Sequence, residues 1–165
     1  MNSKPLKPIT LIVATDDHFA WMLGESDSPD ELSLPPDGVD ARSTVAMLRS
    51  LAAIQRAKRQ TGSWLIAVDR EVVGLCGYKG VPEHGNAEIG FGIASARRGC
   101  GYATQAVAEL LIKVATSPEI GSVTAETATG NRASQRVLEK NSFLNVGSRS
   151  ESADGELIIW LRSAR

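Results

Sequence analysis

Residues 88–104 read EIGFGIASARRGCGYAT, and this stretch decides the fold and the chemistry expected of the chain. Its first part is apolar with alternating glycines and predicts a strand. A glycine-rich loop follows and opens directly into residues 102–116, where apolar side chains recur at helical spacing. Gly99 and Gly101 let the backbone approach a ligand closely. The first turn of the helix offers unpaired N–H groups and the positive end of a dipole, which suit a diphosphate.

This loop differs from two other loops that bind phosphate. The P-loop pattern GxxxxGK[ST] is absent, because no lysine follows these glycines. The dinucleotide-binding pattern GxGxxG is only half matched, because Thr104 occupies the third glycine position. The sheet before the loop is also expected to be antiparallel, so a dinucleotide-binding fold is disfavoured.

On both sides of this stretch, the hydrophobic pattern predicts strands and helices in a definite order. Strands are expected at residues 9–14, 64–68, 72–79, 87–93, 123–127, 143–149 and 157–161. Helices are expected at residues 16–23, 43–59, 102–116 and 131–140, with Asp16 or Asp17 capping the first and a loop at 24–40 before the second. The order β-α-α-β-β-β-α-β-α-β-β places an antiparallel meander before a strand–helix–strand unit. It therefore predicts an α/β (α+β-type) fold with a mixed sheet.

Length and charge limit the class of protein. The 165 residues are 42% hydrophobic and 22% charged, which predicts a single domain over residues 1–165. Eighteen basic and nineteen acidic side chains leave a net charge of −1, so we expect no nucleic-acid partner. The longest stretch without a charged residue, residues 99–108, is far shorter than the roughly 20 apolar residues of a membrane span.

The cysteines and the N-terminal residues bear on the cellular compartment. Cys76 and Cys100 are the two cysteines, and neither has a neighbour at metal-ligand spacing, so no disulfide framework and no metal site are expected. Residues 1–8 lack the apolar core of a signal peptide. We therefore expect a reduced, cytoplasmic protein.

Two segments resemble the GNAT superfamily of N-acetyltransferases. Residues 98–103, RGCGYA, match R/Q-x-x-G-x-G/A, the loop that binds the pyrophosphate of acetyl-CoA in that superfamily. Residues 131–140, NRASQRVLEK, resemble its N-x-x-S-x-x-V-L-E-K helix, above all in the ribosomal-protein N-terminal (RimJ/RimL-like) branch. The resemblance covers about residues 64–160. It departs from the family at Ser142, where a glycine usually precedes the phenylalanine and would suit a left-handed exit from the helix.

The resemblance implies a fold and an activity. The fold is a mostly antiparallel sheet of about seven strands, splayed between the fourth and fifth, with about four flanking helices. The activity is direct transfer of an acetyl group from acetyl-CoA, as co-substrate, to a primary amine, without a metal ion. The acceptor stays open: a protein N-terminus or peptide, a free amino acid, a polyamine or an amine drug. Monomers and homodimers both occur in the family.

The resemblance also implies which residues bind the coenzyme. Backbone N–H groups of the loop are expected to hold the diphosphate, with positive charge from Arg97 and Arg98 beside them. These amides belong to Gly99, Cys100, Gly101, Tyr102 and Ala103, with Thr104 next. The backbone of Phe91 and Ile93 on the fourth strand is expected to bind the pantetheine arm. Asn131 is expected to cap the last helix and to reach the same arm.

The reaction needs a neutral amine, and a lysine amine has a pKa of roughly 10.4 and an α-amine roughly 7.7–8.0. A carboxylate can remove the proton directly or through water. Glu88 on the fourth strand is the favoured base, and Glu126 on the fifth strand is the alternative. The tyrosine that many family members use to protonate the leaving thiolate is missing, because its position holds Leu138. Ser134 matches a serine of the ribosomal-protein branch and is expected to donate that proton or contact the thiol.

Because this tyrosine is missing, a function without catalysis stays open as an alternative. The same fold can serve as a non-catalytic sensor that binds acyl-CoA without turnover. A second alternative keeps the enzyme but uses a longer acyl group. Saturating acetyl-CoA with a panel of amines, and measuring free thiol, separates the enzyme from the sensor.

Overall fold

The computed structural model describes residues 5–165, so residues 1–4 of the N-terminal segment lie outside the described residues. Seven strands form one sheet in the order β1-β2-β3-β4-β5-β7-β6. The strands are β1 (Thr10–Val13), β2 (Ser63–Val68), β3 (Glu71–Tyr78), β4 (Asn86–Ile93), β5 (Ser122–Ala128), β6 (Leu144–Glu151) and β7 (Gly155–Ser163). The helices are α1 (Asp16–Met22), α2 (Arg42–Ala57), α3 (Tyr102–Ala115) and α4 (Arg132–Lys140). The expected order of elements is confirmed, with boundaries shifted by one or two residues.

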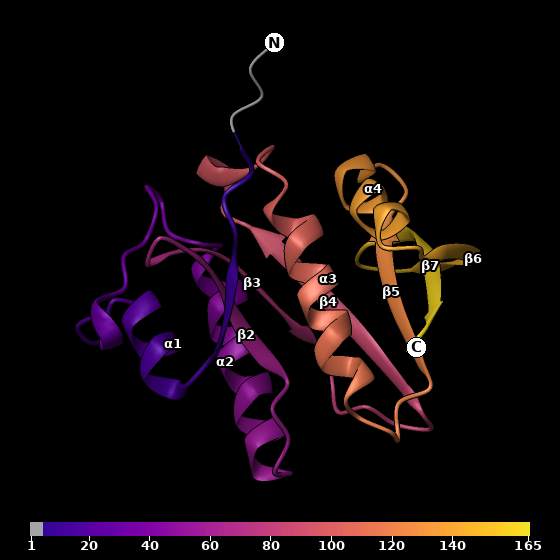
Figure 1. Cartoon of the computed structure of the whole chain (residues 1–165), viewed down its shortest axis with the longest axis horizontal. Coiled ribbons are helices and arrows are strands. Elements are labelled where there is room, and N and C mark those ends of the chain that lie inside the picture. Colours follow the sequence, from indigo (N-terminus) through magenta and orange to yellow (C-terminus); the bar gives the residue numbers. More distant parts are fainter. Residues whose placement is uncertain (1–4) are drawn as a thin grey trace.

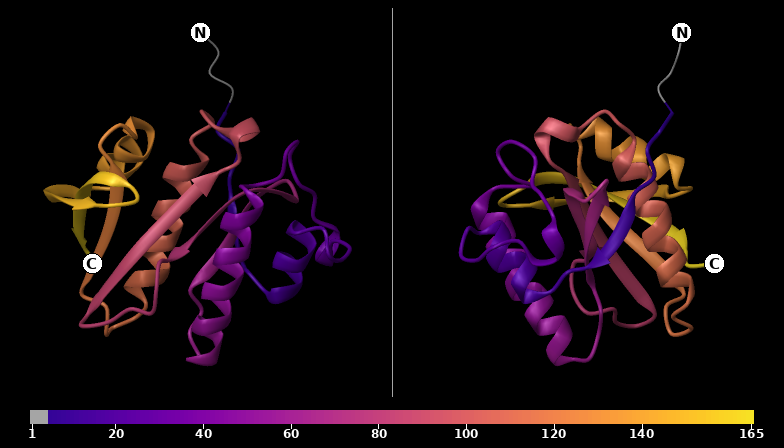
Figure 2. Two further views of the ribbon diagram at one scale, coloured as in Figure 1. Left: turned by 180° about the vertical axis from the view of Figure 1, so that it is seen from behind. Right: turned by 60° about the vertical axis from the view of Figure 1, so that its left-hand side comes forward.

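The sheet separates two hydrophobic clusters. Helices α1 and α2 cover one face and α3 covers the other, as the right-hand view of Figure 2 shows. Side chains alternate along each strand, so neighbours on β2 belong to different clusters. Trp64 packs in the cluster of α3, with Val107 and Leu110, while Leu65 packs in the cluster of α1 and α2, with Phe19. The site described below lies where these two layers meet β4.

Helix α1 begins at Asp16, one residue earlier than a cap at Asp16 would require. Thr15 is its N-cap residue, and the Thr15 hydroxyl accepts a hydrogen bond from the His18 amide (3.4 Å). The prediction that Asp16 or Asp17 caps this helix is therefore wrong. Both acids lie in the first turn, where the helix dipole favours negative charge. The buried imidazole of His18 completes the cap, because its Nδ1 accepts from the Thr15 amide (3.0 Å).

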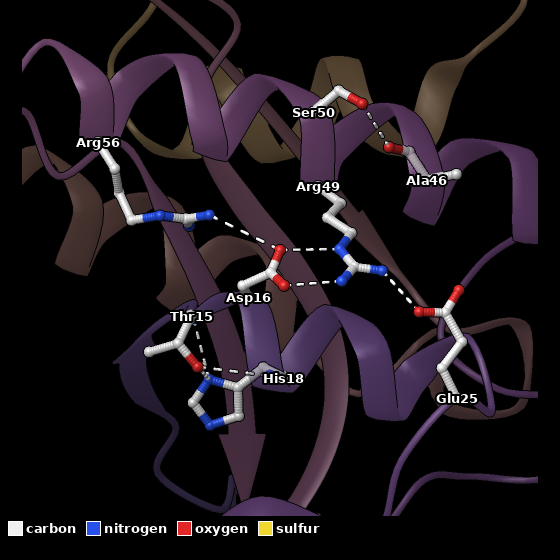
Figure 3. Close-up of polar contacts among 8 residues, drawn as sticks. All are labelled: Thr15, Asp16, His18, Glu25, Ala46, Arg49, Ser50 and Arg56. Carbon is white, nitrogen blue, oxygen red and sulfur yellow. Dashed lines mark hydrogen bonds and ion pairs between the residues drawn. The ribbon is translucent and has the colours of Figure 1, made fainter.

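Asp16 has a partner far away in the sequence. Arg49 on α2 donates to both of its carboxylate oxygens (2.8 and 2.7 Å) and also to Glu25 (2.7 Å), as Figure 3 shows. A paired guanidinium–carboxylate contact fixes direction as well as distance. Arg49 therefore ties α1 and the segment after it to the middle of α2, and fixes the helix pair that covers this side of the sheet.

Strands β4 and β5 are the parallel pair of the sheet, and they separate along their length. They pair at three positions, Asn86 with Ser122, Ala87 with Val123 and Glu88 with Thr124. Beyond these pairs β4 follows β3 and β5 follows β7, so a V-shaped gap opens between them. The two strands meet at one end and diverge toward the other in the left-hand view of Figure 2. The expected splay between the fourth and fifth strands is confirmed.

The closed end of the V is fixed by side-chain hydrogen bonds. The Asn86 amide donates to the Thr124 hydroxyl (2.9 Å) and accepts from the Ser122 hydroxyl (2.9 Å). These bonds join the two strands where their ladder is short. The gap therefore widens in one direction only, toward the loop between β4 and α3 that lies near the N-terminal segment in Figure 1.

Candidate active site

The loop at the open end of the V presents free amides. Gly99 and Gly101 both have a φ of +76°, a left-handed conformation in which glycine carries no steric penalty. Helix α3 follows at Tyr102, and its N-cap residue, Gly101, has no side chain to satisfy the first turn. Among residues 5–165, no backbone carbonyl accepts a hydrogen bond from the amides of residues 99–104. The loop is therefore built to bind an anion.

The two arginines before the loop have different partners. Arg97 forms a paired contact with Glu71 on β3 (2.6 and 3.0 Å), and this contact raises the pKa of Arg97. Its charge is thus compensated within the fold, unlike the free charge expected from the sequence. Arg98 donates instead to the carbonyl of Ile93 (3.2 Å), at the junction of β4 and the loop.

A segment distant in the sequence lies beside the loop. The Gln105 side chain on α3 donates to the carbonyl of Lys7 (3.0 Å). A Cβ added to Gly101 would lie 3.2 Å from a methyl group of Leu6. The sequence pattern does not predict this contact, because it joins residues about a hundred positions apart. A side chain at position 101 would displace the exposed Leu6 only slightly, so the positive φ of Gly101 remains the reason for glycine there.

The backbone of β4 faces both of its neighbours in turn. The carbonyl of Glu88 accepts from the Lys79 amide at the end of β3 (2.8 Å). Backbone groups alternate in direction along a strand, so those of Phe91 and Ile93, an odd number of positions away, face the gap beside β5. The Ile93 carbonyl is taken by Arg98. The amides of Phe91 and Ile93 thus lie along the gap.

The side chains of β4 divide between the two layers. Phe91 and Ile93 are partly buried and pack, with Tyr102, against the cluster of α3. Gly90 and Gly92 point to the opposite face, toward α2. The alternation of apolar residues and glycines along β4 thus gives the strand one apolar face and one glycine face. The glycine face is the one that a second substrate can approach.

Both candidate bases line one polar cavity of about 430 Å³, which extends from the last β4–β5 pair, Glu88 with Thr124, to the end of β5. Its walls are Lys79, Glu88, Glu126, Ala128, Arg149, Glu151, Asp154 and Leu157. Glu88 lies 3.0 Å from the ammonium of Lys79, and its side chain is 39% exposed. The Glu88 carboxylate is therefore accessible to water, and its one ion-pair partner within residues 5–165 is the flexible side chain of Lys79.

Glu126 is held more firmly than Glu88. Arg149 on β6 donates to both of its oxygens (2.7 and 2.8 Å) and also contacts Glu151 (2.8 Å). The hydrogen bonds from Arg149 lower the pKa of Glu126 below its usual 4.5. A carboxylate with a lowered pKa is a weaker base, so this partner weakens the case for Glu126 in proton removal.

Helix α4 carries the two remaining candidates. Asn131 is its N-cap residue, and the side-chain oxygen accepts from the Ser134 amide (3.1 Å), which confirms the capping role. Ser134 is partly buried and lies one turn before Leu138 on the same side of the helix. Leu138, at the position of the family tyrosine, is fully buried in the cluster of α3.

A further cavity, which the sequence pattern does not predict, lies on the glycine face of β4. It measures about 400 Å³ and lies between α2 and strands β3 and β4, reaching Gly90, Phe91 and Gly92. Asp40, just before α2, also lines it. The signal in the sequence is faint: two glycines at alternate positions of β4, which leave one face of the strand without side chains.

Residues 5–165 contain neither a cluster of metal-ligating side chains nor a helix that could cross a membrane. Within that range, no group of three or more histidine, cysteine, aspartate or glutamate side chains is arranged to hold a metal ion. In the same part of the chain, each helix is too short or too polar to cross a membrane.

Comparisons with known proteins agree with this geometry. The family model of an acetyltransferase (GNAT) domain matches residues 10–144. The uncharacterized N-acetyltransferase p20 of Bacillus licheniformis is 31% identical over 125 residues, which cover 74% of this chain and 69% of the relative.

Solved structures show the same fold. RimJ of Mycobacterium smegmatis, in complex with CoA-disulfide, has a TM-score of 0.73 at 23% identity, covering 97% of this chain and 84% of its own. RimL, a ribosomal protein alpha-N-acetyltransferase in complex with coenzyme A, has a TM-score of 0.69 at 17% identity and 96% coverage of both chains. The aminoglycoside acetyltransferase AAC(6')-Ib in complex with coenzyme A has a TM-score of 0.66 at 17% identity, with 94% of both chains covered.

Proposed function

This chain belongs to the GNAT acetyltransferase family, and we propose that it acetylates a primary amine at a site formed by residues 98–104, the open edge of β4 and Glu88. At the level of the family, it is an acetyl-CoA-dependent N-acetyltransferase. The observation that carries the proposal is the continuity of two features. The loop with free amides stands at the wide end of the gap between β4 and β5, so one extended molecule can occupy both.

The coenzyme is proposed to lie along this gap. Amides of Gly99, Cys100, Gly101, Tyr102, Ala103 and Thr104 bind the diphosphate, because they combine free N–H groups with the dipole of α3. Arg98 adds positive charge at the junction with β4. The amides of Phe91 and Ile93 then bind the pantetheine arm as a neighbouring strand would. Asn131, at the start of α4, contacts the arm from the other side of the gap.

Each step of acetyl transfer has a proposed group. The amine nitrogen attacks the thioester carbonyl carbon, and negative charge develops on the carbonyl oxygen. An amide on the open edge of β4 donates to that oxygen, as an oxyanion hole does. The carbon–sulfur bond then breaks, and Ser134 either contacts the departing thiolate or donates a proton to it while accepting one from the attacking nitrogen. The proton of the amine passes to Glu88, directly or through one water.

Glu88 is preferred to Glu126 for two reasons. Its side chain projects to the same face as Gly90 and Gly92, where a second substrate can approach β4. Its partner is one lysine ammonium at 3.0 Å, while Glu126 accepts two hydrogen bonds from the guanidinium of Arg149. Glu126 is therefore proposed to orient the β6–β7 hairpin and to contribute negative charge to the polar cavity.

The first prediction tests this assignment. We expect Glu88→Gln to lower kcat by about 100-fold or more, because a positioned base contributes roughly 10²–10⁴-fold. The KM for acetyl-CoA should stay unchanged, because Glu88 does not touch the loop. Release of free thiol at saturating acetyl-CoA measures both constants.

The matched control is Glu126→Gln, which removes the other carboxylate of the same cavity. Its kcat should fall by less than tenfold, and thermal denaturation should show that both variants are folded. If Glu126→Gln loses more activity than Glu88→Gln, the assignment of the base is wrong.

The comparisons bear on the remaining alternatives. The family model and the curated relative are both acetyltransferases, so the non-catalytic sensor is not favoured. An alpha-N-protein acetyltransferase and an aminoglycoside acetyltransferase both have this fold, which supports an amine acceptor of either class. We also propose that the enzyme acts in the cytoplasm, which the free thiols of Cys76 and Cys100 support.

A further inference from the structure

Resting on the proposed function, we infer that the acceptor is a small primary amine on an apolar body, such as an arylalkylamine. The apolar body fills the cavity between α2 and strands β3 and β4, and Asp40 binds the ammonium group. This inference goes beyond amine acetylation, because it names the class of acceptor and a residue that selects it.

The walls of this cavity are mostly apolar. The residues that line it come from α1, the segment before α2, α2 itself and three strands. Its apolar lining residues are Phe19, Val39, Met47, Leu48, Leu51, Trp64, Leu75, Cys76, Tyr78 and Phe91. Trp64, Cys76, Tyr78 and Phe91 turn their side chains to the cluster of α3. A volume of about 400 Å³ lies within the range of small-molecule sites, roughly 300–1,000 Å³. Binding an apolar ligand against such a surface is favourable, because the apolar surfaces of both leave water.

The cavity reaches β4 where the chemistry is proposed. Gly90 and Gly92 form part of its floor, and Phe91, whose amide faces the gap, also lines it. A Cβ built on Gly92 would lie 3.8 Å from a carboxylate oxygen of Asp40, which is van der Waals contact, so the Asp40 carboxylate stands directly over this glycine. A nitrogen bound to Asp40 would therefore lie beside the glycine face of β4, next to the Lys79 side chain that packs on Gly90.

Asp40 is the one carboxylate among the lining residues. One of its oxygens accepts from the Ala41 amide at the start of α2 (2.6 Å), which holds the group in place. Within residues 5–165, no cationic side chain lies within ion-pair distance of it. Lys79, the cation that lines the cavity, is paired with Glu88 instead. Asp40 is exposed and, in the described part of the chain, unpaired, so its carboxylate is free to bind an ammonium group.

The same walls disfavour acceptors with many polar groups. A polyamine or an aminoglycoside carries several charges or hydroxyls, and each loses hydrogen bonds to water when it is buried. The cavity offers one free carboxylate and few other polar side chains to replace those bonds. Arg49 ties α2 to α1 and to Glu25 (Figure 3). These contacts resist a movement of α1 and α2 that would open the apolar side of the cavity to water.

The first experiment compares amines that differ in the body they carry. The whole chain and acetyl-CoA are incubated with 2-phenylethylamine, ethanolamine, spermidine or a short peptide with a free N-terminus, and free thiol is measured. We expect kcat/KM for 2-phenylethylamine to exceed that for ethanolamine by about 100-fold, because the ring is buried in the cavity.

Two variants test the wall and the carboxylate. Met47→Glu should raise the KM for 2-phenylethylamine at least tenfold, because it places a charge at an apolar wall. Ile54→Glu is its matched control, since Ile54 is similarly exposed on α2 but does not line the cavity. Asp40→Asn should raise the same KM about tenfold with a smaller effect on kcat. Asp37→Asn, on the same loop but outside the lining, should leave both constants unchanged.

The outcomes separate this inference from the proposed function. If spermidine or the peptide is preferred, or if Met47→Glu behaves like Ile54→Glu, the apolar acceptor is wrong while amine acetylation stands. If acetyl-CoA releases no thiol with an amine of any class, the proposed function fails and the inference fails with it. A KM for acetyl-CoA that stays constant in all four variants shows that the coenzyme site is intact.

Discussion

Single residues explain why two carboxylates in one cavity behave differently. Glu126 side-chain atoms are 14% exposed and accept two hydrogen bonds from Arg149, which lower the pKa of Glu126. A lowered pKa in the folded state means that folding favours the ionised form. The resulting stability is fully present above the unfolded-state pKa of 4.5 and is lost as the pH falls through the lower folded-state value.

This linkage predicts how stability depends on pH. At pH 7, Glu126→Gln should lower the Tm by a few degrees relative to the unchanged protein. The difference should shrink as the pH is taken below 4.5, because the unchanged protein then loses the same ion pair by protonation. Thermal denaturation at several pH values measures the effect.

The control for this prediction is Glu109→Gln. Glu109 is an exposed carboxylate on α3 without an ion-pair partner among residues 5–165, so this change should leave the Tm nearly constant at each pH. A Glu126→Gln difference that stays the same from pH 7 to pH 4 would show that the Arg149 contact does not contribute through charge.

At the scale of an element, the end of α4 shows how one residue fixes a turn. Ser142 follows the helix with a φ of +65°, the left-handed conformation that family members reach with glycine. The turn is closed by the amide of Phe143, which donates to the Leu138 carbonyl (3.0 Å). The buried ring of Phe143 then holds the exit in place. Ser142 therefore adopts the same left-handed exit from the helix, and its Cβ makes that backbone conformation sterically strained.

This strain predicts that a substitution at the turn stabilises the protein. Ser142→Gly should raise the free energy of unfolding by about 0.5–1 kcal/mol, because relief of a left-handed residue, about 1–2 kcal/mol, exceeds the entropy that glycine adds to the unfolded chain. The matched change Ser150→Gly, in exposed β6, should destabilise the protein instead. If urea denaturation shows the two changes to have the same sign, the strain at Ser142 is not the cause.

The pattern of elements was predictable, and their long-range partners were not. Apolar periodicity predicted each strand and helix, and RGCGYA predicted the loop, because these signals are local. The cap of α1 was misplaced because Asp16 has another role: it pairs with Arg49, 33 positions away. The ion pair between Arg149 and Glu126 also depends on strand pairing, because β7 lies between β5 and β6 in the sheet and brings the two strands near each other. A local sequence pattern carries no information about which distant residues meet in the fold.

The acceptor cavity escaped prediction for the same reason. Asp40 stands in a loop rich in acids, where the sequence does not distinguish one carboxylate from another. Its place over Gly92 arises only when the loop packs α2 against β3 and β4. The cofactor loop is one contiguous motif, while the cavity is assembled from segments between Phe19 and Gly92.

At the scale of the whole molecule, β4 serves both substrates, one along its edge and the other on its glycine face. The edge of β4 that turns away from β3 carries the coenzyme, because β5 diverges from it and α3 presents free amides at the open end. The glycine face, under α2, receives the amine. Asn86 closes the far end of the V with two side-chain hydrogen bonds, so the two substrates meet between that closure and the loop. The layered fold thus brings two binding sites to a single strand.

The measurement that tests this account most directly is an amide NMR titration of the isotope-labelled chain with coenzyme A. We expect the resonances of Gly99, Cys100, Gly101 and Thr104 to shift, together with those of Phe91 and Ile93 on β4. ADP, which carries the diphosphate without the arm, should shift the loop resonances and leave β4 unchanged. Resonances of the loop that stay in place at saturating coenzyme A would contradict the account.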